Sequence, residues 1–172
     1  YVVRNVKKMV PAYNLPGAVR LSGALNVAAL ERAFALLVAR HEALRTVFGL
    51  QEGQPVQQIL PAAFHLPLID LSMLESQGAE VERLLAAEIH HAFDLAQGPL
   101  FRATLLCLQP QQEHVLLLNL HHTVGDGWSL EVLQRELAEN PEQQVMILAH
   151  NKSLLTYLHK AIEHRGIAGG SV

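Results

Sequence analysis

The sequence predicts a single α/β domain. Its 172 residues have the length of one ordinary domain, and 50% of them are hydrophobic, which excludes a wholly disordered chain. Segments with the apolar spacing of amphipathic helices alternate with short apolar segments typical of strands, and no long internal repeat is visible. Because alternating helices and strands bury their apolar faces against each other, we expect helices packed on a sheet.

A strand and a helix are predicted first. Residues 18–22 have a strand pattern that ends at Gly23, and Asn26 stands where a helix N-cap belongs. The predicted helix continues to about His41. One apolar stripe of this helix is formed by Leu30, Phe34, Leu37 and Val38.

A hairpin and a connector follow. Residues 44–48 and 56–60 are predicted to pair across a turn at Glu52-Gly53. Residues 61–72 contain prolines and short polar residues, which favour an irregular connector.

The rest of the chain is predicted to hold three helices and two strands. The helices are expected at about 76–91, 128–139 and 142–164. The strands, 101–108 and 114–120, are apolar along almost their whole length, which predicts that both of their faces are covered.

Composition excludes several classes of protein. A formal net charge of −3 argues against nucleic-acid binding, and no apolar run approaches the ~20 residues of a membrane-spanning helix. Cys107, the one cysteine, lies in an apolar run and cannot form an internal disulfide, so we expect a buried thiol in a reducing, cytoplasmic compartment. No cysteine cluster supports zinc, and His90-His91 reads better as a helix end than as a metal pair.

Residues 121–129, with the sequence HHTVGDGWS, are the strongest candidate for chemistry. They lie between a predicted strand and a predicted helix, and Gly125 and Gly127 allow tight backbone turns. An imidazole can accept a proton from an amine, hydroxyl or thiol near neutral pH, which is general-base catalysis. Amide groups of the glycine-rich turn could stabilise an oxyanion.

The same residues also have a purely structural interpretation. A pair of histidines at a strand end can simply be a satisfied loop feature. Asp126 could orient an imidazole, or it could cap the helix that follows. Residue types alone leave both interpretations open.

Three segments together resemble a known family. His121-His122 followed by Asp126-Gly127 resembles the HHxxxDG signature of the condensation domains of nonribosomal peptide synthetases, which chloramphenicol acetyltransferase shares. Residues 40–48 (RHEALRTVF) resemble the RHExLRT motif of these domains, and residues 93–102 (FDLAQGPLFR) resemble their FDLxxGPLxR segment. The resemblance extends from about residue 12 to residue 137.

The resemblance implies roles for individual residues. His122 would be the general base or position the substrate, and His121 would be its structural partner. Asp126 would support the loop by ion pairing, and Gly127 would keep the loop open beside the substrate. Supporting structural roles fall to Arg40, Arg45 and Trp128, with Arg45 a candidate partner for a carboxylate.

It also implies a fold and a reaction. The expected fold is the two-layer α/β sandwich of chloramphenicol acetyltransferase, a mixed sheet with helices mainly on one face. In the implied reaction, an amine attacks a thioester to form an amide, with both substrates tethered through phosphopantetheine to carrier proteins. No bound cofactor and no metal are expected.

Only the first half of a condensation domain is matched. We divide the chain into an unmatched segment (1–11), the half-domain (12–137), a terminal helical segment (138–165) and a flexible tail (166–172). Because exposed apolar surface tends to find a partner, we expect a homodimer, or docking of a separate second half, to complete the cleft. The alternative is a catalytically inactive remnant or gene-cassette protein that acts as a binding or assembly module.

Overall fold

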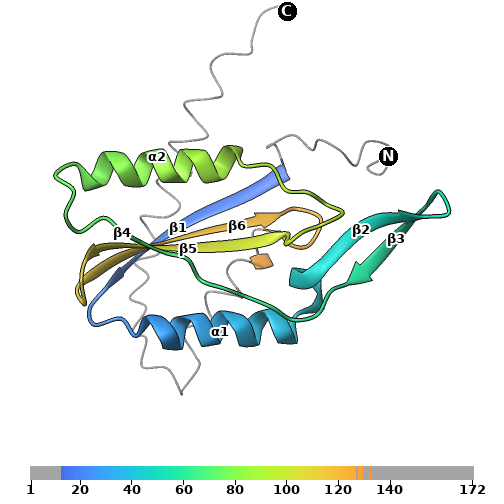
Figure 1. Cartoon of the computed structure of the whole chain (residues 1–172), viewed down its shortest axis with the longest axis horizontal. Coiled ribbons are helices and arrows are strands. Elements are labelled where there is room, and N and C mark those ends of the chain that lie inside the picture. The colour runs from blue at the N-terminus through green and yellow to red at the C-terminus, as the bar shows by residue number, and fades with distance from the viewer. Residues whose placement is uncertain (1–12, 127, 130–131, 133–172) are drawn as a thin grey trace, which may run out of the picture.

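The computed structural model describes residues 13–126, 128–129 and 132. In Figure 1, a twisted sheet lies between two long helices, and a separate hairpin projects beyond it. The four-stranded sheet has the order β1-β6-β5-β4, with β1 at Asn14–Ser22, β6 at Glu113–His121, β5 at Phe101–Gln109 and β4 at Leu68–Asp70. The sheet is mixed, as predicted, because β4 is parallel to β5 whereas the other pairs are antiparallel.

Helix α1 (Val27–Arg40) forms where the sequence predicts it. The side chain of Asn26 accepts a hydrogen bond of 2.9 Å from the backbone N–H of Ala29, which satisfies one of the free donors of the first turn. The residues of α1 that are buried are Ala29, Leu30, Ala33, Phe34, Leu37 and Val38. They include the whole predicted stripe, so the 3.6-residue spacing correctly identified the inner face of the helix.

One face of the sheet is covered by α1. Its side chains join those of alternate residues on the strands in the largest apolar cluster. Phe34 stacks on Phe64 with ring centroids 5.2 Å apart and lies 5.9 Å from the ring of Phe101. These aromatic contacts tie the helix both to β5 and to the connector before β4.

The opposite face of the sheet is covered by α2 (Gln77–His90). Val81, Leu84 and Leu85 pack there against residues such as Leu106 and Leu117. The fold class is confirmed, but the expectation of helices mainly on one face is corrected, since the described part has one helix on each face. The physical reason lies in β5 and β6, which are apolar on both faces and need cover on both.

The hairpin is built from β2 (Thr46–Gln51) and β3 (Gln54–Ile59). Glu52 and Gly53 connect the strands with φ angles of 52° and 77°, the positive values that a two-residue hairpin turn requires.

Two short elements were not predicted. The 3₁₀ turn η3 (Glu42–Arg45) and strand β4 are too short to produce a periodic pattern, and β4 lies in the segment predicted to be a connector. Of the helix predicted at 128–139, only residues 128, 129 and 132 are described, and they are helical. The helix predicted at 142–164 and the tail lie outside the described residues. Within the part of the chain that is described, no helix is long and apolar enough to cross a membrane.

Candidate active site

The end of β6 places the two histidines of the HHxxxDG segment. Strand β6 lies between β1 and β5, so its last residue, His121, is held on both sides. The backbone N–H of His121 donates to the carbonyl of Leu100 at 2.9 Å, and that of His122 donates to the carbonyl of Tyr13 at 2.9 Å. These bonds fix the backbone at the point where the chain leaves the sheet.

The ring of His121 is buried, with 1% of the residue exposed. Phe93 meets it edge-on at a centroid distance of 5.7 Å, and Tyr13 lies 6.2 Å away. Its Nδ1 is 2.9 Å from Oγ1 of Thr123. Burial, with a smaller contribution from the nearby His122, lowers the pKa of His121 and favours the neutral ring. This geometry suits a structural role.

In contrast, the residue His122 is exposed. It is the first residue after β6, and its side chain is therefore free of the packing that encloses His121. A cavity of about 580 Å³ lies between β5, the start of β2 and the connector before β4, and another of about 280 Å³ lies beneath α2. Neither is lined by His122, so in the described part this side chain faces solvent and not one of these two cavities.

Asp126 contacts Ser129 at the start of the helical residues that follow. Its Oδ1 accepts hydrogen bonds from the backbone N–H and the hydroxyl of Ser129, at 2.9 and 2.8 Å, and its own N–H donates to that hydroxyl at 3.1 Å. The Ser129 hydroxyl is the main cause of a lowered pKa for Asp126, which remains ionised at neutral pH. Of the two interpretations left open, these contacts are those of a helix cap.

The loop needs glycine at position 125 for space. A Cβ there would lie 2.5 Å from Cδ2 of Leu120 and 3.1 Å from Cβ of Ser129. Among the described residues, the glycines with positive φ are Gly23, Gly53 and Gly98, so Gly125 does not use the left-handed backbone conformation that glycine allows. Close packing of the turn onto the end of β6 is the physical reason for glycine here. Gly127 lies outside the described residues.

The three segments that carry the family resemblance are joined in space. Gly98 has a φ of 63°, and a Cβ on it would lie 2.8 Å from Cγ1 of Val47 in β2. The backbone N–H of Phe48 donates to the carbonyl of Leu95 at 2.7 Å. Since Leu100 in turn accepts from His121, residues 40–48, 93–102 and 121–126 form one continuous assembly.

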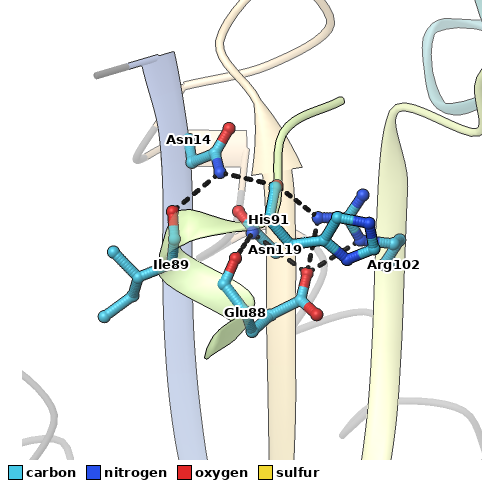
Figure 2. Close-up of polar contacts among 6 residues, drawn as sticks. All are labelled: Asn14, Glu88, Ile89, His91, Arg102 and Asn119. Carbon is cyan, nitrogen blue, oxygen red and sulfur yellow. Dashed lines mark hydrogen bonds and ion pairs between the residues drawn. The ribbon is translucent and has the colours of Figure 1, made fainter. Parts of the chain in front are cut away.

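A polar cluster at the end of α2 supports this assembly (Figure 2). Arg102 donates from Nε to Oε1 of Glu88 at 2.7 Å and from Nη2 to the carbonyl of His91 at 2.9 Å. Its guanidinium carbon lies 3.8 Å from the centre of the Phe93 ring, which contacts His121. Arg102 thus connects β5 to the buried histidine through one aromatic ring.

Two asparagines complete the cluster. Asn119 of β6 donates to the carbonyl of Glu88 at 2.8 Å and to Oε1 of Glu88 at 3.1 Å. Asn14 of β1 donates to the carbonyls of Ile89 and His91 at 2.9 and 3.1 Å. Figure 2 shows the last turn of α2 held over β1 and β6 by these side chains.

Sequence reasoning missed this cluster, although two signals were present. Asn119 interrupts an otherwise apolar run, and Glu88 continues the helical spacing of the apolar residues Val81, Leu84 and Leu85. A polar group taken out of water needs a hydrogen-bond partner, and the amide nitrogen of Asn119 finds its partners in Glu88.

The predicted supporting residues lie in different places. Arg45 donates from Nη1 to the carbonyl of Leu60 at 2.8 Å, which joins η3 to the end of the hairpin, and its Nη2 is 3.4 Å from a carboxylate oxygen of Glu42. Arg40 is exposed at the end of α1, and Trp128 is 67% exposed beside the turn. Among the residues that the structure describes, no three histidine, cysteine or acidic side chains are grouped to hold a metal ion.

The model of the family described as Condensation domain matches residues 1–153. The chain belongs to the condensation domain family. This match extends on both sides of the resemblance at 12–137 and confirms the family predicted from the three segments.

Large synthetases contain similar sequences. The chain is 47% identical over 129 residues to malpibaldin synthetase of Mortierella alpina, and 47% identical over 127 residues to the dimodular nonribosomal peptide synthase of Bacillus subtilis (strain 168). Each match covers 74% of this chain, but they cover only 2% and 5% of the two relatives.

Solved condensation domains have the same fold. The starter condensation domain of rhizomide synthetase is 25% identical with a TM-score of 0.70, over 75% of this chain and 31% of that domain. The first condensation domain of the calcium-dependent antibiotic synthetase is 29% identical with a TM-score of 0.68, over 76% of this chain and 32% of that domain. The chain therefore spans about a third of the solved domains that it matches.

Proposed function

We propose that this chain contributes the histidine-bearing part of a condensation site, which forms an amide from a carrier-bound thioester and an amine. The observation that carries the proposal is the contrast at the end of β6. His121 is buried and neutral, whereas the adjacent His122 is exposed on a backbone fixed from both sides. An exposed imidazole on a rigid support can meet a substrate and accept its proton.

His122 takes the role of general base, or of a group that positions the amine. The amine nitrogen attacks the thioester carbonyl and forms the C–N bond, while its proton moves to the imidazole. The C–S bond then breaks, and the leaving thiolate takes the proton back from the imidazole. His121 and Asp126 act on the reaction through structure, the first by packing and the second by capping the following helix.

The substrates are presented by carrier proteins through phosphopantetheine. Such a reaction requires protein surface on the side of the substrates opposite His122, because positioning of two substrates supplies much of the rate. This chain matches about a third of a solved condensation domain. We propose that a second half-domain or a second copy of the chain lies opposite His122, and that residues 12–137 form the unit that docks.

Amide formation tests the proposal. The chain is incubated with an acyl thioester and an amine, alone and with a separately produced second half of a condensation domain, and amide and free thiol are quantified. Replacement of His122 by Ala should reduce the rate by about 100-fold or more. His65→Ala is the matched control, since His65 is a solvent-exposed histidine of the connector before β4.

Two results would contradict the proposal. Equal rates for the wild type and His122→Ala would remove His122 from the chemistry. A wild-type chain that never exceeds the uncatalysed rate, with or without the second half, would instead favour an inactive binding or assembly module. Sedimentation of the chain tests the proposed homodimer, and a strict monomer at high concentration would exclude it.

A further inference from the structure

Thr123 contacts the ring of His121 through two groups. Its hydroxyl oxygen lies 2.9 Å from Nδ1, and its backbone N–H donates to the same nitrogen at 3.3 Å. A backbone N–H can only donate a hydrogen bond, so Nδ1 must be the acceptor. In the neutral ring, the proton is therefore on Nε2.

In the described part, the second nitrogen of the ring offers no hydrogen bond that competes with the contact at Nδ1. Nε2 of His121 is buried and has no hydrogen-bond partner among the described residues. The His121 ring as a whole contacts the aromatic rings of Phe93 and Tyr13. The position of the ring proton is thus determined at Nδ1, where Thr123 is the neighbour.

His122 lies between these two interacting residues. The turn that contains it is closed by the backbone N–H of Val124, which donates to the carbonyl of His121 at 3.0 Å. The N–H of His122 is itself bonded to the carbonyl of Tyr13. A change in the contact between Thr123 and the His121 ring would therefore be transmitted directly to the backbone of His122.

We propose that Thr123 is a positioning residue, which holds His121 as the Nε2–H tautomer and thereby fixes the direction of the His122 side chain. The consequence for catalysis rests on the proposed function, whereas the structural effect does not. Protonation of Nδ1 would place a donor against the backbone N–H of Thr123 and open the turn. When Nδ1 is unprotonated, the hydroxyl of Thr123 also donates to it at 2.9 Å and so strengthens the contact that the backbone N–H makes.

Nuclear magnetic resonance of the ¹⁵N-histidine-labelled chain tests the structural effect. In the wild type, the ¹⁵N chemical shifts of His121 should be those of a protonated Nε2 and of an unprotonated Nδ1 that accepts a hydrogen bond. Thr123→Val removes the hydroxyl with little change in shape, and it should lower the solvent-exchange protection of the His122 N–H about fivefold. It should also change the ¹⁵N shifts of His121, whereas Thr123→Ser, which keeps the hydroxyl, should show the wild-type His121 shifts and His122 protection. Thr104→Val, which removes a hydroxyl from a half-buried position of β5, is the control and should match the wild type.

The inference is overturned if the wild-type ring carries its proton on Nδ1, or if Thr123→Val leaves the His121 shifts and the His122 protection unchanged. Amide formation provides the second measurement. Thr123→Val should lower kcat about fivefold with little change in KM, and Thr123→Ser should recover it. Unchanged kcat despite altered His122 protection would overturn the positioning role. Correct tautomer signals in a wild-type chain without any turnover would refute the proposed function alone.

Discussion

At the scale of single residues, neighbours in the sequence acquire opposite environments at the end of β6. The ring of His121 packs among aromatic side chains, whereas His122 is the first residue beyond the strand. Side chains alternate between the two faces of a strand, but the alternation ends with the strand itself. The exact end of β6 therefore decides which histidine is buried, and it is set by the bonds to Leu100 and Tyr13.

Gly125 provides a prediction at this scale. Gly125→Ala should destabilise the chain by about 1–3 kcal/mol, because the new methyl group would overlap the buried side chain of Leu120. Urea unfolding followed by circular dichroism measures the change. Gly49→Ala is the matched control, since a Cβ at Gly49 meets open space and its φ is not positive. Equal losses in the two variants would show that the turn does not pack as described.

At the scale of elements, the two helices are attached to the sheet in different ways. Helix α1 buries six residues, whereas α2 has no fully buried residue and contacts the sheet through half-buried apolar side chains. The polar cluster around Glu88 supplements this weaker apolar contact at one end of α2. We infer that polar bonds matter more for the attachment of α2 than for that of α1.

Removal of the Glu88 carboxylate tests this inference. Glu88→Ala should destabilise the chain by about 1–3 kcal/mol, because it leaves Arg102 without its carboxylate partner. Glu80→Ala is the control on the same helix, since its ion pair with Arg83 is more exposed to solvent, and the loss there should be much smaller. Hydrogen exchange of α2 should increase in the first variant and remain unchanged in the second.

The cap of α1 allows a second test at this scale. Asn26→Ala removes the acceptor for the N–H of Ala29 and should cost about 1 kcal/mol of folding stability. Asn26→Asp or Asn26→Ser should retain most of the stability, because both side chains can accept the same bond. A loss of equal size in all three variants would mean that the contact at Ala29 is not what stabilises the helix start.

At the scale of the whole molecule, two buried histidines of the described part link folding to pH. Burial lowers the pKa of both His114 and His121 below the ordinary value of 6.5. The unfolded chain therefore binds more protons than the folded chain below about pH 6.5. Stability should be complete above this pH and should fall as the pH decreases, by at most about 1.4 kcal/mol per pH unit for each histidine.

Urea unfolding between pH 7.5 and 5 measures this slope. His114→Gln should reduce the slope in this range, whatever its effect on the stability at pH 7.5. His65→Gln should leave the slope near that of the wild type, since the side chain of His65 is 81% exposed. Carboxylates with a lowered pKa, such as Asp126, lose their contribution only at lower pH, near their ordinary value of 3.8. A flat profile from pH 7.5 to 5 would contradict the burial of both rings.

Local patterns in the sequence were sufficient for the long elements. The stripe of α1, its cap at Asn26, the turn at Glu52-Gly53 and the apolar strands β5 and β6 all depend on residues close together in the chain. The three segments that resemble condensation domains could also be recognised as short sequence patterns, and the family match confirms the family that they predicted.

Contacts between distant residues could only come from the tertiary structure. It placed α1 and α2 on opposite faces, buried one histidine and exposed the other, and gathered Asn14, Glu88, Arg102 and Asn119 at one end of α2. Asn14 and its partner Ile89 are separated by 75 positions, and such a separation leaves no periodic trace in a sequence. Amino-acid order by itself determined the long helices and strands and the family, because these depend on local spacing. Packing decided the environment of each candidate catalytic group, because burial and hydrogen bonding depend on which distant surfaces meet.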